Sequence, residues 1–190
     1  AANAVATSQP LAATAALDIL RDGGNAVDAA IAAAMALTVV EPCSNGIGGD
    51  AFAIVHDGTR LHGLNASGRA PHAWSLDRFD GHEHMPTLGW EAVTIPGAVS
   101  GWAALSERFG RMPMTRLVEA AAHYARDGFP VSPQAAASWA RAATRYAGCP
   151  DWLQTFAPDG RTPRPGERFA CPAQATTLEA IASSSGEDFY

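Results

Sequence analysis

Arg69 is the residue of this sequence best suited to holding a substrate. It lies in the run Asn-Ala-Ser-Gly-Arg-Ala-Pro at residues 65–71, directly after a predicted strand. A guanidinium group in such a place can hold a carboxylate through two parallel hydrogen bonds. It can equally cap a turn by donating hydrogen bonds to carbonyl groups. The residues alone leave both interpretations open.

The chain also contains possible nucleophiles, namely Cys43, Ser44, Ser67 and Ser100. None of them lies in a G-x-S-x-G run or in a comparable sequence that exposes a nucleophile on a sharp turn. We therefore expect no catalytic residue within this chain.

His82-Glu83-His84 is the one short run with metal-ligand character. Metal coordination would need a further carboxylate in a fixed geometry, and nothing in the sequence fixes one. An H-x-H pair in a polar stretch is more often solvated. We predict no metal site and no cofactor.

The glycine-rich run Gly46-Ile47-Gly48-Gly49-Asp50 invites comparison with loops that bind phosphate. Nucleotide loops follow a strand and open a helix, whereas these glycines follow a predicted helix and enter a predicted strand. We therefore interpret Gly46, Gly48 and Gly49 as a structural turn with close approach of the backbone.

Composition places the chain among globular proteins and excludes several partners. The hydrophobic share of 47% with 17% charged residues favours a packed core over disorder. The net charge is −6 and the thirteen basic residues are scattered arginines, so we expect no nucleic-acid partner. The absence of lysine excludes Schiff-base chemistry within the chain. The longest apolar stretch, residues 29–40, is shorter than the roughly 18 residues of a membrane span, so we expect no membrane partner.

The cysteines and the two ends of the chain give little information on redox environment or cellular compartment. Cys43, Cys149 and Cys171 are widely spaced and suggest neither a disulfide framework nor a zinc ribbon. No uncleaved signal peptide is visible, which slightly favours the cytoplasm, although a removed signal would allow the periplasm. We expect the polypeptide to continue beyond Tyr190, because residues 187–190 form neither a polar tail nor a stop.

The first part of the sequence predicts two helices. Apolar residues at helical spacing indicate a helix over residues 11–21, which Gly23-Gly24 ends. Asn25 is a good N-cap, and Asp28 three residues later resembles a capping box. The helix that follows, residues 27–40, is apolar all round, which is typical of a central helix.

Strands and further helices are expected after it. Residues 51–56 predict a strand, and Asp57-Gly58 predicts a type I′ turn into a second strand over residues 59–64. Residues 90–95 predict a third strand. The remaining predicted elements are helices at residues 98–109, 113–125 and 133–146, an irregular stretch at residues 157–166 and the start of a helix at residues 176–183.

Several runs agree in order and spacing with one known family. Residues 10–30, which include Gly-Gly-Asn-Ala-Val-Asp-Ala-Ala, resemble the opening of γ-glutamyltranspeptidase large subunits. Val40-Glu41-Pro42, Ser-Asn-Gly-Ile-Gly-Gly at residues 44–49, Ile-Pro-Gly-Ala-Val-Ser-Gly at residues 95–101 and Ala-Arg-Asp-Gly-Phe at residues 125–129 follow in the family's order. The resemblance covers roughly residues 3–135. It identifies residues 1–190 as an N-terminal portion of such a large subunit, with no internal domain boundary.

The resemblance implies an α+β fold and a partner. The fold would be the αββα four-layer sandwich of N-terminal nucleophile hydrolases, of which this chain is only the N-terminal part. In such enzymes a precursor cleaves itself, and the new N-terminal Thr of the small subunit is the nucleophile. Thr176-Thr177 precedes Leu178 in a helical pattern and does not match the family's Thr-Thr-His start. The nucleophile is therefore expected on a partner small subunit.

One departure from the family concerns the substrate, which the resemblance implies to be a small γ-glutamyl or other acyl amide. The typical family sequence at this strand end is Arg-Glu-x-Ala-Pro, whose Arg holds the α-carboxylate of the γ-glutamyl group. Aligned on Ala70-Pro71, that position is Ser67. Arg69 lies two residues later and, in an extended segment, points to the same face. We therefore take Ser67 and Arg69 as the substrate-binding candidates.

The leading hypothesis is the large-subunit part of an enzyme that cleaves γ-glutamyl or related acyl amides and passes the acyl group to water or to an amine. The Ser-Gly-Arg-Ala-Pro form resembles the γ-glutamyltranspeptidase-like and cephalosporin-acylase-like branches of the family, so a glutaryl or cephalosporin acylase is an alternative. A non-catalytic binding or scaffold fragment is an alternative from another class, because the nucleophile is absent from this chain.

Overall fold

The computed structural model describes residues 2–190, and these residues form two compact units. The first contains the residues up to Gly46 together with Ala103–Tyr190, and the second is Ile47–Trp102. The expectation of one undivided portion over residues 1–190 stays a prediction, because compactness alone does not show that a unit has its own core and folds alone.

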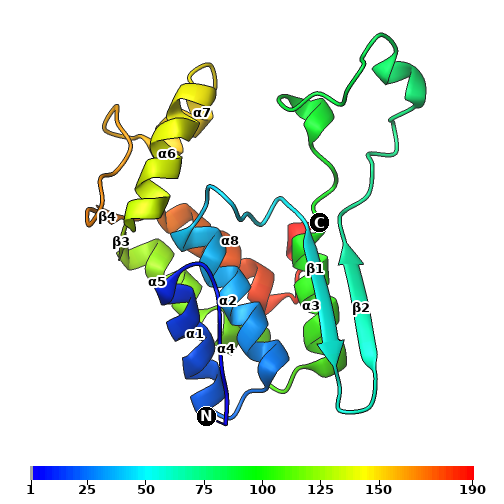
Figure 1. Ribbon diagram of the computed structural model, residues 1–190, viewed down its shortest axis with the longest axis vertical. Coiled ribbons are helices and arrows are strands. Elements are labelled where there is room, and N and C mark those ends of the chain that lie inside the picture. The colour runs from blue at the N-terminus through cyan, green and yellow to red at the C-terminus, as the bar shows by residue number, and fades with distance from the viewer. Residues whose placement is uncertain (1) are drawn as a thin grey trace. The chain divides into compact units, whose positions relative to one another are not determined.

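The first unit is mainly helical. Helix α2 packs against α1 and α5, and α5 packs against α8 (Figure 1). A pair of two-residue strands, β3 and β4, is antiparallel, with Phe129 opposite Phe169. Its elements are α1 (Pro10–Arg21), α2 (Ala26–Val40), α4 (Met114–Leu117), α5 (Glu119–Asp127), β3 (Phe129–Pro130), α6 (Pro133–Arg145), α7 (Pro150–Phe156), β4 (Arg168–Phe169), α8 (Pro172–Ser183) and the 3₁₀ turn η3 (Glu187–Phe189).

Helix α2 is the central helix of this unit, as its apolar sequence predicts. Ile31, Met35 and Val40 are almost completely buried, and Thr38 is buried as well. The Thr38 hydroxyl donates to the Met35 carbonyl at 2.7 Å, so its polar group is satisfied inside the helix.

The start of α2 has the predicted capping box. The Asn25 side-chain oxygen accepts from the backbone N–H groups of Val27 and Asp28 at 2.8 and 3.0 Å. The Asp28 carboxylate accepts from the Asn25 N–H at 2.9 Å. The Asn25 side-chain amide also donates to the Phe109 carbonyl at 2.6 Å, which ties the helix start to a segment 84 residues away.

Asp28 itself is completely buried and is bonded to backbone groups from two segments. Besides Asn25, it accepts from the N–H of Arg111 at 3.0 Å and from that of Met112 at 3.4 Å. Gly110 lies against it, since an added Cβ at that position would be 3.0 Å from Asp28 Oδ1 and 2.5 Å from the Ser106 carbonyl. The buried charge is thus solvated by backbone N–H groups instead of water.

The second unit contains the antiparallel hairpin of β1 (Ala51–His56) and β2 (Leu61–Ala66), the 3₁₀ turns η1 (Leu76–Phe79) and η2 (Trp90–Ala92), and the first residues of α3 (Ala98–Phe109). Gly101 of α3 lies against the inner face of the hairpin, where an added Cβ would be 2.9 Å from the Ala66 Cβ. The outer face leaves Phe52, Ile54 and Leu61 exposed.

The hairpin turn differs from the predicted type I′ turn. The N–H of Asp57 donates to the Arg60 carbonyl, so Gly58 and Thr59 are the two central residues. Gly58 has a φ of 97°, whereas Thr59 is not among the residues with positive φ. Positive φ at the first central residue alone is the type II′ pattern, which spares the β-branched Thr59 a left-handed conformation.

The predicted strand over residues 90–95 is wrong. Residues 90–92 form η2, and Val93 and Ile95 are exposed. The Ile95 N–H donates to the Arg69 carbonyl at 2.9 Å, so its backbone bonds to a loop instead of a neighbouring strand.

Smaller differences concern helix bounds. The helix predicted at residues 113–125 is two helices, α4 and α5, joined at Val118. Helix α8 begins at Pro172, four residues before the predicted start, because a proline is well suited to the first helical turn. Helix α7 and the strands β3 and β4 have no counterpart among the predictions. None of the helices in residues 2–190 has both the length and the apolar character needed to cross a membrane.

We expect Asp28→Ala in the full-length protein to lower the free energy of unfolding of the helical unit by about 3 kcal/mol, because it removes a buried carboxylate that accepts from the N–H groups of Asn25, Arg111 and Met112. Native-state hydrogen exchange of the α2 amides measures this change. Asp18→Ala is the matched control, since the Asp18 ion pair with Arg21 is exposed and is worth about 0.5 kcal/mol or less. Equal effects of the two changes would contradict the assigned role of Asp28.

The hairpin turn should be sensitive to acid through Asp57. The Thr59 hydroxyl, His62, and the backbone N–H groups of Arg60 and Thr59 hold the pKa of Asp57 well below its usual range. A lowered folded pKa adds stability that is fully present above the ordinary value of about 3.9 and is lost as the pH falls through the folded pKa. Asp57→Ala should therefore reduce hydrogen-exchange protection of β1 and β2 above pH of about 4, with the difference from wild type closing on acidification. A difference independent of pH would show that the carboxylate charge is not responsible, and Asp80→Ala serves as an exposed control.

Candidate functional site

Three backbone segments that carry the sequence-predicted residues meet in the second unit. The Gly49 carbonyl accepts from the N–H groups of Gly97 and Ala98 at 2.9 and 3.0 Å. The Arg69 carbonyl accepts from the Ile95 N–H at 2.9 Å. Residues 94–98 therefore contact both the glycine turn and the loop that contains Arg69.

Two glycines allow these segments to come so close. An added Cβ at Gly97 would lie 2.1 Å from the Ala66 carbonyl oxygen and 2.5 Å from the Gly68 nitrogen. An added Cβ at Gly68 would lie 2.1 Å from the Ile95 carbonyl oxygen, and Gly68 has a φ of 80° that favours glycine. Both positions thus require glycine for steric reasons.

Arg69 has a fixed backbone and an exposed side chain. Among residues 2–190, no hydrogen bond or ion pair engages its guanidinium. Of the two carbonyl groups nearby, that of Ser67 accepts from the Thr94 hydroxyl, and that of Ile95 lies against Gly68. The guanidinium therefore caps no turn within the described residues, and ligand binding by Arg69 stays a prediction.

Ser67 is also exposed, two residues before Arg69. Its N–H donates to the Asn65 side-chain oxygen at 3.0 Å, and its carbonyl accepts from the Thr94 hydroxyl at 3.4 Å. The loop thus presents one hydroxyl and one guanidinium from a short, hydrogen-bonded stretch of chain.

The glycines predicted to form a close-packed turn behave differently from one another. None of Gly46, Gly48 and Gly49 has a positive φ. An added Cβ at Gly46 or Gly48 would meet no described atom within 4 Å. The backbone approaches closely at Gly49, whose carbonyl accepts from Gly97 and Ala98, and glycine is required sterically at Gly68 and Gly97.

Sequence reasoning missed the roles of Thr94, Gly68 and Gly97. In the sequence, the Pro-Gly pair at residues 96–97 stands out only as part of the family-like run at residues 95–101. The sequence signal that could have indicated this contact is the presence of Gly68 in the run at residues 65–71 and of Gly97 in the run at residues 95–101. A glycine outside a turn often marks close approach of two backbones.

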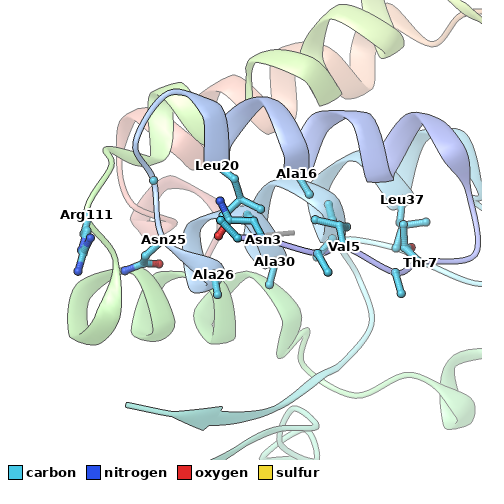
Figure 2. A pocket seen from close by; sticks show the side chains of 17 residues that line it. Asn3, Val5, Thr7, Ala16, Leu20, Asn25, Ala26, Ala30, Leu37 and Arg111 are labelled. Atoms are coloured by element: carbon cyan, nitrogen blue, oxygen red, sulfur yellow. The ribbon is translucent and has the colours of Figure 1, made fainter. Parts of the chain in front are cut away.

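A pocket of ≈ 760 Å³ lies in the first unit between α1, α2 and residues 2–7. Figure 2 shows Arg111 and Asn25 at one end and Thr7 and Leu37 at the other. Of its seventeen lining residues Arg111 alone is charged, and most are alanine. The lining therefore contains no pair of acid and base.

A second cavity of ≈ 280 Å³ in the same unit is lined mainly by aromatic residues and by Cys43. Burial and the charge of Glu41 raise the pKa of the Cys43 thiol, which outweighs the opposite effect of Arg141. A thiol with a raised pKa is protonated at neutral pH and is a weak nucleophile.

The histidine run at residues 82–84 is exposed. Within the part of the chain that the structure describes, no three His, Cys, Asp or Glu side chains gather as metal ligands would. The closest histidine–carboxylate pair in the hairpin, His62 Nε2 and Asp57 Oδ2 at 2.6 Å, belongs to the turn described above.

Residues 12–190 match the family model for gamma-glutamyltranspeptidase, and the chain belongs to this family. Two curated relatives are the oxamate amidohydrolase proenzyme of Klebsiella pneumoniae and the glutathione hydrolase proenzyme 1 of Schizosaccharomyces pombe. The first is 39% identical over 95% of this chain and 35% of its own length. The second is 36% identical over 98% of this chain and 30% of its own length. The chain thus spans about a third of the length of the curated relatives it matches.

Solved structures agree with the family. The cephalosporin acylase from Bacillus halodurans is 48% identical, with a TM-score of 0.91 over 97% of this chain and 36% of its own. The gamma-glutamyltranspeptidase from Pseudomonas nitroreducens, complexed with L-DON, is 34% identical, with a TM-score of 0.90 over 99% of this chain and 56% of its own. The predicted α+β fold of an N-terminal nucleophile hydrolase, of which this chain is the N-terminal part, is confirmed.

Proposed function

We propose that this chain is the N-terminal part of the large subunit of an enzyme that cleaves γ-glutamyl or related acyl amides and transfers the acyl group to water or to an amine. The observation that carries the proposal is the exposed guanidinium of Arg69 on a loop whose backbone is hydrogen-bonded to residues 94–95. Family membership supports the reaction class.

The chemistry is divided between this chain and a small subunit. The N-terminal Thr of that subunit attacks the amide carbonyl through its hydroxyl, its α-amine takes the hydroxyl proton, and the amine of the substrate leaves with a proton. Water or an acceptor amine then attacks the acyl-enzyme and releases the threonine. The relatives named as proenzymes support such a precursor.

The role of this chain is to hold the far end of the acyl group. An acyl group of the γ-glutamyl or glutaryl type ends in a carboxylate, and a planar guanidinium matches a carboxylate through two hydrogen bonds. Arg69 supplies the guanidinium. The Ser67 hydroxyl, which donates to the Gly68 carbonyl at 3.5 Å in this structure, would turn to the substrate as a further donor.

A glutaryl or cephalosporin acylase is the second candidate, and two observations favour it. The cephalosporin acylase from Bacillus halodurans is 48% identical to this chain. Residues 65–71 also contain no acidic side chain that could pair with the α-ammonium group of a γ-glutamyl substrate. A glutaryl group has the carboxylate without the ammonium, so it needs no acidic partner in this loop.

Self-cleavage separates both enzyme functions from a non-catalytic scaffold. We expect the full-length gene product to yield two subunits, the smaller beginning with Thr, and to turn over a γ-glutamyl anilide, a glutaryl amide or both. Gel analysis, N-terminal sequencing and release of the amine measure these outcomes. A precursor that stays intact and inactive would support the scaffold instead.

Arg69→Ala should lower kcat/KM for the preferred carboxylated substrate by about ten- to a hundredfold, because a hydrogen bond to a charged group is worth about 1.5–3 kcal/mol. Arg69→Lys should recover only part of the loss, since an ammonium group lacks the planar fork. Arg60→Ala is the matched control, because Arg60 is exposed at the hairpin turn of the same unit. Wild-type kinetics of a self-cleaved Arg69→Ala enzyme would assign Arg69 to the protein surface.

A further inference from the structure

Residues 94–97, which we name the clamp, contact residues 66–69 at the start of the Arg69 loop. The Thr94 hydroxyl donates to the Ser67 carbonyl at 3.4 Å, and the Ile95 N–H donates to the Arg69 carbonyl at 2.9 Å. Gly97 is buried against the Ala66 carbonyl and the Gly68 nitrogen. Each residue from 66 to 69 therefore touches the clamp through its backbone.

We propose that the clamp is the positioning element that sets the selectivity of the enzyme for carboxylated acyl groups, by fixing where Arg69 presents its guanidinium. This inference rests on the proposed role of Arg69 and adds residues to it that touch no substrate. Thr94 and Gly97 act only through the loop.

The steric argument for Gly97 is the strongest. A methyl group there would lie 2.1 Å from the Ala66 carbonyl oxygen, whereas real Cβ atoms essentially never lie closer than 3.0 Å to such a neighbour. To lengthen this distance from 2.1 to 3.0 Å, the Cβ at position 97 and the Ala66 carbonyl oxygen have to move apart by at least 0.9 Å. Because the obstructing atoms belong to the backbone, either the Arg69 loop or the clamp has to move.

The clamp also connects the Arg69 loop to the glycine turn. Gly97 and Ala98 donate to the Gly49 carbonyl, so a displacement of the clamp changes both neighbours together. Hydrogen bonds thus join residues 94–98 both to Gly49 and to the Ser67–Arg69 run, although the three segments are separate in sequence.

Displacement of a binding group by about 1 Å can reduce catalysis as much as a hundredfold. It should affect substrates that use Arg69 more than substrates that do not. The informative quantity is therefore a selectivity ratio, kcat/KM for a glutaryl amide divided by kcat/KM for the uncharged pentanoyl amide of the same leaving group.

The experiment uses the full-length, self-cleaved enzyme and its variants Gly97→Ala, Thr94→Ala, Arg69→Ala and Gly63→Ala. We expect Gly97→Ala to lower the selectivity ratio by about tenfold or more, with the loss mainly in KM for the carboxylated substrate. Thr94→Ala, which removes one long hydrogen bond and a contact over Gly68, should lower it by about threefold. Gly63→Ala is the matched control and should leave the ratio unchanged, since an added Cβ there meets no described atom within 4 Å and its φ is not positive.

The outcomes separate this inference from the proposed function. If Arg69→Ala lowers the ratio and neither clamp variant does, the clamp has no positioning role and the proposed function stands. If Arg69→Ala leaves the ratio unchanged, both fail. If Gly97→Ala does not fold or cleave itself, Thr94→Ala decides, and an unchanged ratio in that variant overturns the inference.

Discussion

The carboxylate of Asp28 is the interaction on which the helical unit depends. It is completely buried, and the backbone N–H groups of Asn25, Arg111 and Met112 solvate it. A buried charge is costly unless it is fully hydrogen-bonded, so the helix start and the segment after α3 have to keep this arrangement together. The constraint fixes where α2 begins, and α2 is the helix against which α1 and α5 pack.

The second unit also depends on hydrogen bonds between segments that are distant in sequence. Its loops satisfy their polar groups by bonding to one another, as the bonds from residues 94–98 to Arg69 and Gly49 show. A two-stranded hairpin alone is marginal in water. The outer-face residues Phe52, Ile54 and Leu61 are exposed in this part of the chain, which covers 36% of the cephalosporin acylase that it resembles.

Local sequence patterns predict much of the fold. The features that they miss depend on contacts between residues that are distant in sequence. The spacing of Asn25 and Asp28 predicts the capping box because both partners lie in one helical turn. The bonds from Asp28 to Arg111 and Met112 span more than eighty residues, and no local pattern contains them. Residues 90–95 have a strand-like sequence, yet strand formation needs a partner strand, and Ile95 bonds to the Arg69 loop instead.

The candidate site is likewise predictable from the sequence only in part. The position of Arg69 after a strand and its departure from the family sequence are readable from the chain, and β2 does end at Ala66. The clamp depends on the approach of Gly97 to Ala66 and Gly68, which becomes visible only in three dimensions. The family model supports the general reaction. That these few loop residues determine the identity of the acyl group is our proposal.

The measurement that tests this account most directly is a crystal structure of the full-length, self-cleaved enzyme with a trapped glutaryl or γ-glutamyl acyl group. We predict that the terminal carboxylate lies about 3 Å from two nitrogens of the Arg69 guanidinium, with the loop held by Ile95 as it is here. A carboxylate bound by other residues, with Arg69 still in solvent, would contradict the account.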